Sequence, residues 1–573
     1  MAPASDLLGE GRALARTIRV GDSPFFKAQG VPSEAAYKAR EAAARRIMSH
    51  AHIGYRSLDR TLDAVAVLAD RADAENLPIA RFGITLDWSM GYPADQRKGA
   101  TLGTGIVLEG ADDFARITHK TPIAAHFGDF MIGLPAALEN TIAALEAGVT
   151  TIGNMGQYFT FRLPGWDDDV FTTETTVRAL GLIGAQERDV LVHSNLDDGF
   201  AGLFEDVASA LGMALVERHI LEDLIGVKAA FCFGHHFSSP LSRLAFHAAL
   251  SSRTTAPGSM IYGNTIAYQG TEAANYASLS SYLLADIIAL RRNPTGHAIN
   301  PVPVTENRRI PDVDEILDAQ RFAARLAEHA HGTADLIDEA PITALADRLV
   351  AGGEAFKDRL LAGLADRGVD PSDPAALLLA IKRLGAKRIE ALFGAGEGAA
   401  EALVPADWVM ALNATAQGWV AARAPTLTPA KGLKVALGTT DVHEHGAYLV
   451  ADVLTQLGIE VVVYAIAIDP DDLVAEAEAA GADLIAVSTY NGVGVPFVEG
   501  LRATGTDLPI IVGGKLNAVP EGSNTDLPVD VTGAIAAAGA TPCADLDAMV
   551  PVLLACAARR QQPHDKGSQC AQQ

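Results

Sequence analysis

The chain has 573 residues, 49% of them hydrophobic and 20% charged, and a formal net charge of −25 at pH 7. This length exceeds one ordinary hydrophobic core, so we expect two or three globular domains. The acidic charge disfavours a nucleic-acid partner, and four cysteines without CxxC spacing disfavour a disulfide scaffold or a zinc cluster. Without a signal pattern or an apolar run of about 18 residues, we expect a cytoplasmic protein with no membrane contact.

Residues 51–310 alternate short apolar segments with Ala- and Leu-rich helical segments, and they follow an N-terminal helical arm over residues 1–50. The apolar segments predict strands at 80–85, 122–125, 150–152, 190–192, 228–233 and 259–262. About 260 residues of such alternation are typical of an α/β fold of the (β/α)8 TIM-barrel type. Two of the eight strands are not identified in this way.

Several predicted strands end in polar loops, and barrels place their active sites at this end. His126, His193 and His235 each follow a strand, so we take them as candidate catalytic residues. A structural role for each histidine and a protein-bound metal are the alternatives, although the adjacent His235 and His236 cannot easily face one metal. Candidate substrate-binding residues after a further strand are Asn154, Gln157, Tyr158 and Arg162. Asn and Gln also commonly cap turns, so a structural role is open for them too.

The strand pattern disappears over residues 311–428, which are rich in Ala, Leu, Arg and Glu and predict a helical segment. The stretch 424–429 contains two prolines, which disfavour a continuing helix, so we expect a short linker there. A further domain should then occupy residues 429–560. The polar tail, 561–573, is expected to be disordered.

The segment Asp441-Val442-His443-Glu444-His445-Gly446 carries the clearest functional signal. It lies between a strand-like run and a helix-like run, so its histidine projects past the carboxyl end of a strand, where open α/β sheets bind ligands. Asp441 can accept a hydrogen bond from the other ring N–H of His443, which fixes the tautomer and raises the basicity of the ligand. Gly446 leaves room for a ligand to pass close to the backbone.

Further apolar segments alternate with helical ones in the same region and predict strands at 460–464, 483–487 and 508–512. This alternation predicts a doubly wound, flavodoxin-like (Rossmann-like) parallel sheet. Ser488-Thr489-Tyr490 follows one of these strands, and Gly513-Gly514 follows another. A flavodoxin-like domain with an incidental histidine loop is the alternative interpretation.

These motifs resemble the base-off/His-on cobalamin-binding family, whose signature is Asp-x-His-x-x-Gly, then Ser-x-Leu, then Gly-Gly. The first and third elements match, whereas Tyr490 replaces Leu in the second. The resemblance implies that His443 is the lower axial ligand of the cobalt and Asp441 its hydrogen-bond partner. The spacing to Gly446 favours His443 over His445 as that ligand. The residues that would border the displaced nucleotide tail are Ser488, Tyr490, Gly513 and Gly514.

A barrel joined to such a domain resembles the adenosylcobalamin-dependent carbon-skeleton mutases, among them the glutamate mutase (methylaspartate mutase) family. The likeness in the barrel is loose and covers residues 121–169 and 270–275. It implies adenosylcobalamin as the cofactor and radical isomerisation of a small polar substrate, such as an amino acid or a carboxylic acid. It also implies that Glu272, a further catalytic candidate, and Asn275, a further substrate-binding candidate, contact the adenosyl ribose. The arginines with which that family holds two carboxylates are replaced here by histidines.

Two other functions are open. A methylcobalamin-dependent methyltransferase would use residues 311–428 as a cap, although its corrinoid module normally has a compact helical bundle directly before the sheet. A cobalamin-dependent sensor would normally carry a DNA-binding module, which the acidic charge disfavours. For the isomerase, we expect a homodimer acting on a small molecule.

Overall fold

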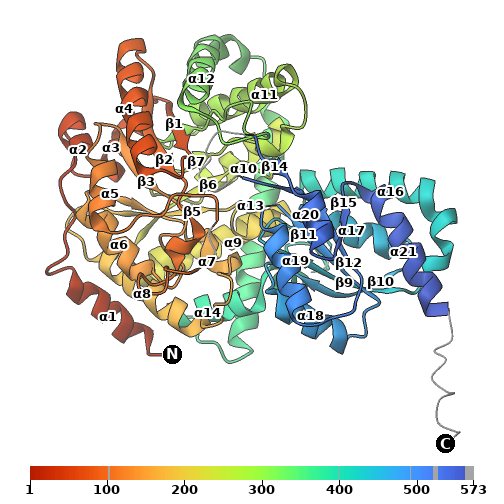
Figure 1. Cartoon of the computed structure of the whole chain (residues 1–573). Helices are drawn as coiled ribbons and strands as arrows, with labels where there is room; N and C mark the ends of the chain where they lie inside the picture. The colour runs from red at the N-terminus through yellow and green to blue at the C-terminus, as the bar shows by residue number, and fades with distance from the viewer. Residues whose placement is uncertain (101–102, 399–400, 491, 520–526, 562–573) are drawn as a thin grey trace, which may run out of the picture. The chain divides into compact units, whose positions relative to one another are not determined.

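The computed structural model describes residues 1–100, 103–398, 401–490, 492–519 and 527–561. The chain forms two compact units, the first over Met1–Trp408 and the second beginning at Val409 (Figure 1). No described helix combines the length and the apolar character that crossing a lipid bilayer requires. Disorder was predicted for the tail, residues 561–573. Of these, only Gln561 belongs to the described residues.

The first unit is built around an eight-stranded parallel sheet with the order β3-β2-β1-β8-β7-β6-β5-β4. Its strands are β1 (Met48–Ile53), β2 (Ile79–Ile84), β3 (Ala124–Phe127), β4 (Thr151–Ile152), β5 (Leu191–Asn195), β6 (Lys228–Phe233), β7 (Met260–Ile261) and β8 (Ala298–Ile299). No ladder joins β3 to β4 among the described residues. The sheet is therefore a nearly closed (β/α)8 barrel, as the sequence predicted.

Helices follow the strands and surround the sheet (Figure 1). They are α4 (Leu58–Glu75), α5 (Ala111–Thr118), α6 (Ala137–Glu146), α7 (Gly156–Thr160), α8 (Asp169–Gly184), α9 (Val207–Arg218), α10 (Pro240–Ser251), α11 (Glu272–Arg292) and α12 (Val313–Ala334). Because α12 packs against both α11 and α4, it completes the helical wall after β8. Part of the helical segment predicted for 311–428 thus belongs to the barrel.

The remaining helices of that segment are α13 (Glu339–Ala365), α14 (Pro374–Leu384), α15 (Ala386–Phe393) and α16 (Asp407–Leu427). Helix α13 packs against α9 and α10, and α14 packs against α8. Almost all of α16 lies in the second unit. The linker predicted at 424–429 was wrong, because α16 continues through Pro425 and is followed by a short 3-10 turn at Thr428–Ala430. Pro425 lies in the last turn of α16, and Leu427, which ends the helix, is buried.

Two strands of the barrel escaped prediction because their sequences lack a continuous apolar run. Strand β1 reads Met-Ser-His-Ala-His-Ile and falls partly within the predicted helical arm, whereas β8 has two residues. The rest of the arm forms α1 (Ala4–Leu14), α2 (Pro24–Gln29) and α3 (Glu34–Ala43). Helix α3 lies at the amino end of β4, where Lys38 Nζ donates to Thr151 Oγ1 at 3.3 Å.

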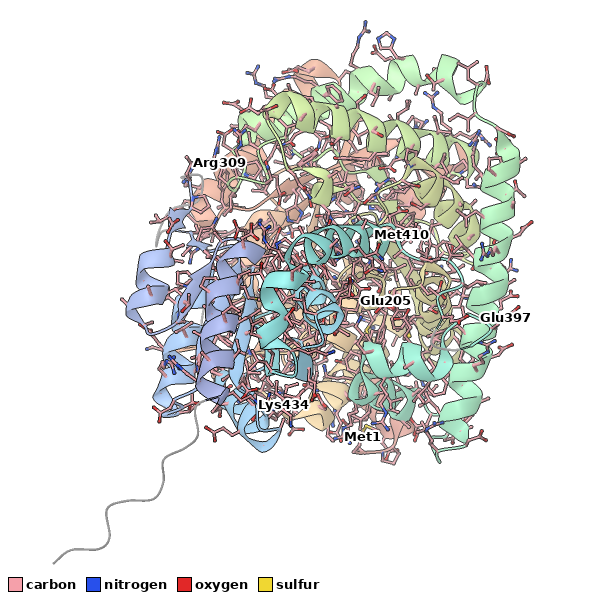
Figure 2. All side chains as sticks on the ribbon, turned by 90° about the vertical axis from the view of Figure 1, so that its right-hand side faces the viewer. Met1, Glu205, Arg309, Glu397, Met410 and Lys434 are labelled. Carbon is pink, nitrogen blue, oxygen red and sulfur yellow. The ribbon has the colours of Figure 1, made fainter. Side chains whose placement is uncertain are left out.

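The second unit contains a five-stranded parallel sheet with the order β10-β9-β11-β12-β15. Its elements are β9 (Lys434–Thr439, with Lys434 labelled in Figure 2), α17 (His445–Gln456), β10 (Glu460–Ala465), α18 (Pro470–Ala479), β11 (Leu484–Thr489), α19 (Gly494–Ala503), β12 (Ile510–Gly514), α20 (Thr532–Ala537), β15 (Thr541–Cys543) and α21 (Leu546–Gln561). A short antiparallel pair joins β13 (Asn517–Ala518) to β14 (Val529–Asp530).

This sheet is covered on both faces, as the doubly wound prediction required. Leu437 and Leu484 contribute to a core with α16, α17 and α21, whereas Ala436 and Ile485 contribute to a core with α18, α19 and α20. Successive residues of a strand point to opposite faces, so the near-continuous apolar strands supply both cores. The chain reverses its winding between β9 and β11, and loops at such a switch point form the ligand crevice of open α/β sheets.

Candidate functional site

The loop after β9 holds one histidine against a buried carboxylate. Asp441 Oδ1 accepts hydrogen bonds from the backbone N–H of His443 at 2.8 Å and from its ring Nδ1 at 2.5 Å. Asp441 is 4% exposed, whereas the His443 side chain is 45% exposed. Because Nδ1 carries the proton in this arrangement, the lone pair is assigned to Nε2 on the accessible edge of the ring.

The charge of Asp441 is maintained by its contacts. Burial alone would raise its pKa, but hydrogen bonding and attraction to His443 outweigh burial, and the pKa lies below its ordinary value. Thr440 Oγ1 also donates to Asp441 Oδ2 at 3.2 Å. An anionic acceptor at Nδ1 makes Nε2 a stronger electron donor. Histidines that bind metals generally have such an acceptor on their other ring nitrogen.

Tyr490, at the carboxyl end of β11, packs against this imidazole. The two rings stack with centroids 4.1 Å apart and an interplanar angle of 22°. The ammonium of Lys515 lies 3.9 Å from the Tyr490 ring centroid. The tyrosine that replaces the leucine of the Ser-x-Leu motif thus limits the rotation of His443.

Glycines bring the surrounding backbones close together. A Cβ on Gly446 would lie 2.7 Å from Ser488 Oγ, so only glycine lets the start of α17 approach β11 in this way. Gly514 has φ +101°, and a Cβ there would lie 2.2 Å from the carbonyl oxygen of Thr489. Asp441, His443, Gly446, Ser488 and Tyr490 are therefore brought together, with Gly513-Gly514 on the neighbouring strand β12.

A second candidate site is a cavity of about 160 Å³ inside the barrel, towards the carboxyl ends of the strands. The residues that line it are His50, His52, Arg81, His126, Gly128, Asp129, His193, Asn195, Asp198, His235, Met260 and Tyr262. Strand register explains much of this set. Pairing of β1 with β2 places His50 beside Arg81 and His52 beside Gly83, and pairing of β2 with β3 places Gly83 beside His126.

Gly83 makes room for the histidines of β1. A Cβ at this position would lie 2.8 Å from both His50 Nε2 and His52 Nδ1. The ring of His126 packs edge-to-face on that of His193, with centroids 4.8 Å apart. Burial, reinforced by the charge of Arg81, lowers the pKa of all four imidazoles, and that of His52 to about 4. They are neutral hydrogen-bonding groups at pH 7.

Carboxyl groups lie in the loops at the carboxyl ends of β3 and β5. Asp198 Oδ2 accepts from Asn154 Nδ2 at 2.7 Å and from Asn195 Nδ2 at 2.9 Å. Burial and the nearby charges of Asp129 and Asp197 raise the pKa of Asp198 well above its ordinary value, and burial raises that of Asp129 to about 6. Asp197 instead accepts the backbone N–H groups of His235 and His236, so it anchors the loop after β6.

The structure places three of the four predicted catalytic residues at the cavity and the fourth on the surface. His126, His193 and His235 all line the cavity. Glu272 lies on the surface at the start of α11, 3.3 Å from Arg308 Nη1, and does not line it. No group of three or more His, Cys, Asp or Glu in the described part of the chain is arranged to hold a metal ion.

The predicted substrate-binding residues do not line the cavity either. Asn154 is the nearest, because it holds Asp198. Gln157 accepts from the backbone N–H of Phe130 at 2.8 Å, and the hydroxyl of the buried Tyr158 meets Thr173 Oγ1 at 2.8 Å. Arg162 is half-exposed, with Nη2 4.0 Å from Asp169 Oδ2, and Asn275 donates to the carbonyl oxygen of Val304 at 2.8 Å. These contacts fasten loops and helices to one another.

Nine of the twelve cavity residues were not predicted as site residues, among them His50, His52, Arg81, Asp129 and Asp198. A signal for two of them is present in the sequence. His50-Ala51-His52 alternates as a strand does, and residues two apart on a strand point to the same face. Neither aspartate shows such a pattern, because each reaches the cavity from a loop whose position depends on barrel closure.

Comparison with known proteins bears on the second unit. A family model for the B12 binding domain matches residues 435–540. No curated protein matches the chain. The donor chemistry agrees with such a cofactor, because a half-exposed imidazole whose other nitrogen donates to a buried carboxylate could bind a cobalt ion. The C-terminal part of this chain therefore contains a B12-binding domain, and a nearly closed (β/α)8 barrel precedes it.

Proposed function

We propose that this protein is an adenosylcobalamin-dependent radical isomerase whose barrel holds a small polar substrate. The observation that carries the proposal is the polar cavity towards the carboxyl ends of the barrel strands, in the same chain as a B12-binding domain. When bound, the cofactor supplies the radical through its weak cobalt–carbon bond. The protein must then bind the substrate, orient it and exclude water.

Each part of the chain has a defined task in this proposal. His443 would hold the cobalt from below, and Asp441 would keep its Nδ1 protonated. Ser488, Tyr490 and Gly513-Gly514 would border the nucleotide tail. In the barrel, the neutral imidazoles of His126 and His193 would donate and accept hydrogen bonds without introducing charge. Hydrogen bonds from these side chains would orient the substrate for the radical reaction.

Electron paramagnetic resonance tests the proposal. The full-length protein is loaded anaerobically with adenosylcobalamin, mixed with small amino and carboxylic acids, and frozen. A substrate-triggered signal from cob(II)alamin coupled to an organic radical supports the isomerase. The His443→Ala protein should lose nitrogen coupling to the cobalt, whereas the surface variant Glu478→Gln on α18 should keep it.

Other outcomes would overturn the proposal. Transfer of a methyl group from methylcobalamin to a thiol or a folate, without a radical signal, would identify a methyltransferase. Cobalamin binding without either reaction over this substrate range would favour a sensor. Absence of bound corrinoid from the purified, cobalamin-treated protein would remove the basis of all three functions.

A further inference from the structure

The inner end of the barrel cavity carries excess positive charge. Arg81 is 1% exposed, and its Nη1 has no hydrogen-bond partner among the described residues. Its nearest carboxylate is Glu34, whose Oε2 lies 3.9 Å from Nη1. Glu34 is already paired with the buried Lys38 at 3.3 Å. Two cations therefore share one carboxylate, and the guanidinium can still bind an anion.

The opposite end carries the carboxyl groups of Asp129 and Asp198. Neither forms an ion pair with any described residue, although both line the cavity. The amides of Asn154 and Asn195 hold one oxygen of Asp198, which fixes the orientation of this carboxyl group. A protonated amine placed here would supply the missing countercharge, and charge-assisted hydrogen bonds of this kind are the strong ones.

The wall between the two ends is uncharged but polar. His126 is 5% exposed, and its Nδ1 has no partner among the described residues, so a hydrogen-bonding group of a ligand can satisfy it. A buried polar atom without a partner costs free energy, and such atoms point to a missing ligand or water. The nitrogens Arg81 Nη1 and His126 Nδ1 are thus available to hydrogen-bond a ligand or water in the cavity.

We propose that the cavity binds a small molecule with one carboxylate at Arg81 and one protonated amine at Asp129 and Asp198. This inference rests on the proposed function, because it names the substrate class of the same cavity. Only Nη1 of this one guanidinium is without a hydrogen-bond partner among the described residues, so we expect it to hold a single carboxylate and dicarboxylates to bind more weakly. The cavity has a volume of about 160 Å³, so we expect a ligand with a short carbon chain.

Calorimetric titration of the full-length protein tests this charge pattern with four probes of similar length. They are 4-aminobutyrate, butyrate, butylamine and glutarate. We expect 4-aminobutyrate to bind about tenfold more tightly than each of the others, because each of the others lacks one charge partner or carries the wrong one. Equal binding of glutarate, or no binding of 4-aminobutyrate at millimolar concentrations, would overturn the inference.

Single substitutions test which residues of the cavity bind the amine and which bind the carboxylate. Asp198→Asn should weaken 4-aminobutyrate binding about tenfold and leave butyrate binding unchanged. Arg81→Met should weaken binding of both ligands, provided that circular dichroism shows an intact fold. Asp112→Asn, which removes one negative charge from the exposed start of α5, is the matched control and should change nothing. An Asp198→Asn protein with unchanged selectivity would contradict the assignment even if Arg81→Met fails to fold.

These titrations separate the inference from the proposed function. Selective binding without a cobalamin-linked radical would leave the ligand class intact and remove the isomerase. A radical elicited equally by dicarboxylates would support the isomerase and overturn the ligand class.

Discussion

The hydrogen bond between Asp441 and His443 offers the sharpest test of the proposed axial ligand. Replacing Asp441 by Asn keeps the side-chain volume and an oxygen for the backbone N–H of His443, which lies 2.8 Å from Oδ1. It removes the negative charge from a 4%-exposed carboxylate that lies 2.5 Å from ring Nδ1. The loop should therefore keep its conformation, while Nε2 becomes a weaker ligand.

Loss of such a partner typically weakens metal binding by about 10- to 100-fold, or about 1.4 to 2.7 kcal/mol. Because this bond is short and its acceptor is buried, we expect the upper part of that range, about 30- to 100-fold. The observable quantity is the Kd of the full-length protein for aquacobalamin, measured by absorbance titration. Nitrogen coupling in the paramagnetic resonance spectrum of the cob(II)alamin form should weaken in parallel.

Two further variants serve as controls for this measurement. His443→Ala removes the ligand altogether and sets the spectrum expected without imidazole binding. Glu478→Gln removes one negative charge from the exposed face of α18 and should bind cobalamin like the unchanged protein. If Asp441→Asn binds within twofold of the unchanged protein and keeps its nitrogen coupling, the carboxylate does not support an axial imidazole, and the reasoning is refuted.

Three predictions concern the barrel. Asp286→Asn should cost about 3 to 5 kcal/mol in urea unfolding, because it leaves the fully buried guanidinium of Arg243, 2.7 Å away, without a countercharge; a loss below 1 kcal/mol would contradict this. Gly83→Ala places a Cβ 2.8 Å from a ring nitrogen of His52, so we expect a loss of about 1 to 3 kcal/mol and weaker ligand binding, measured by thermal unfolding and titration. Burial lowers the pKa of His52 and His247 from 6.5 to about 4. As the pH falls, the unfolded chain therefore takes up protons before the folded protein does. Each histidine should contribute about 3 kcal/mol to the free energy of unfolding above pH 6.5, and this contribution should be lost as the pH falls towards 4. A free energy of unfolding that stays constant from pH 7 to 5 would contradict this prediction.

The histidine loop of the second unit was predictable because its features are local in sequence. Asp441 and His443 lie two residues apart at the end of an apolar strand, and the aspartate reaches the ring without help from distant segments. The doubly wound sheet was predictable for a similar reason, since each parallel strand is a short apolar run between helices. The motifs Ser488-Thr489-Tyr490 and Gly513-Gly514 come near this loop only because their strands pair in the sheet. They could still be recognised, because they follow the histidine loop in the order of the family signature.

The barrel as a fold was predictable from its alternation, but its cavity was not. Strand β1 carries two histidines where an apolar strand would carry valine or isoleucine, so the sequence pattern concealed both the strand and two cavity residues. Arg81 lies within a predicted strand, and only the register with β1 shows that it points inward beside His50. Polar side chains inside a barrel oppose the hydrophobic pattern from which strands are recognised.

The sequence by itself therefore determined the α/β alternation of the barrel, the parallel class of both sheets and the histidine loop of the second unit. Only the tertiary structure decided which charges share the barrel interior. Arg81, Asp129 and Asp198 come from three different strand–loop segments, and barrel closure brings them to one cavity. Sequence patterns over a few residues indicate which side chains are buried and where the chain turns. The charge balance of a cavity depends instead on contacts between segments that lie far apart in the chain.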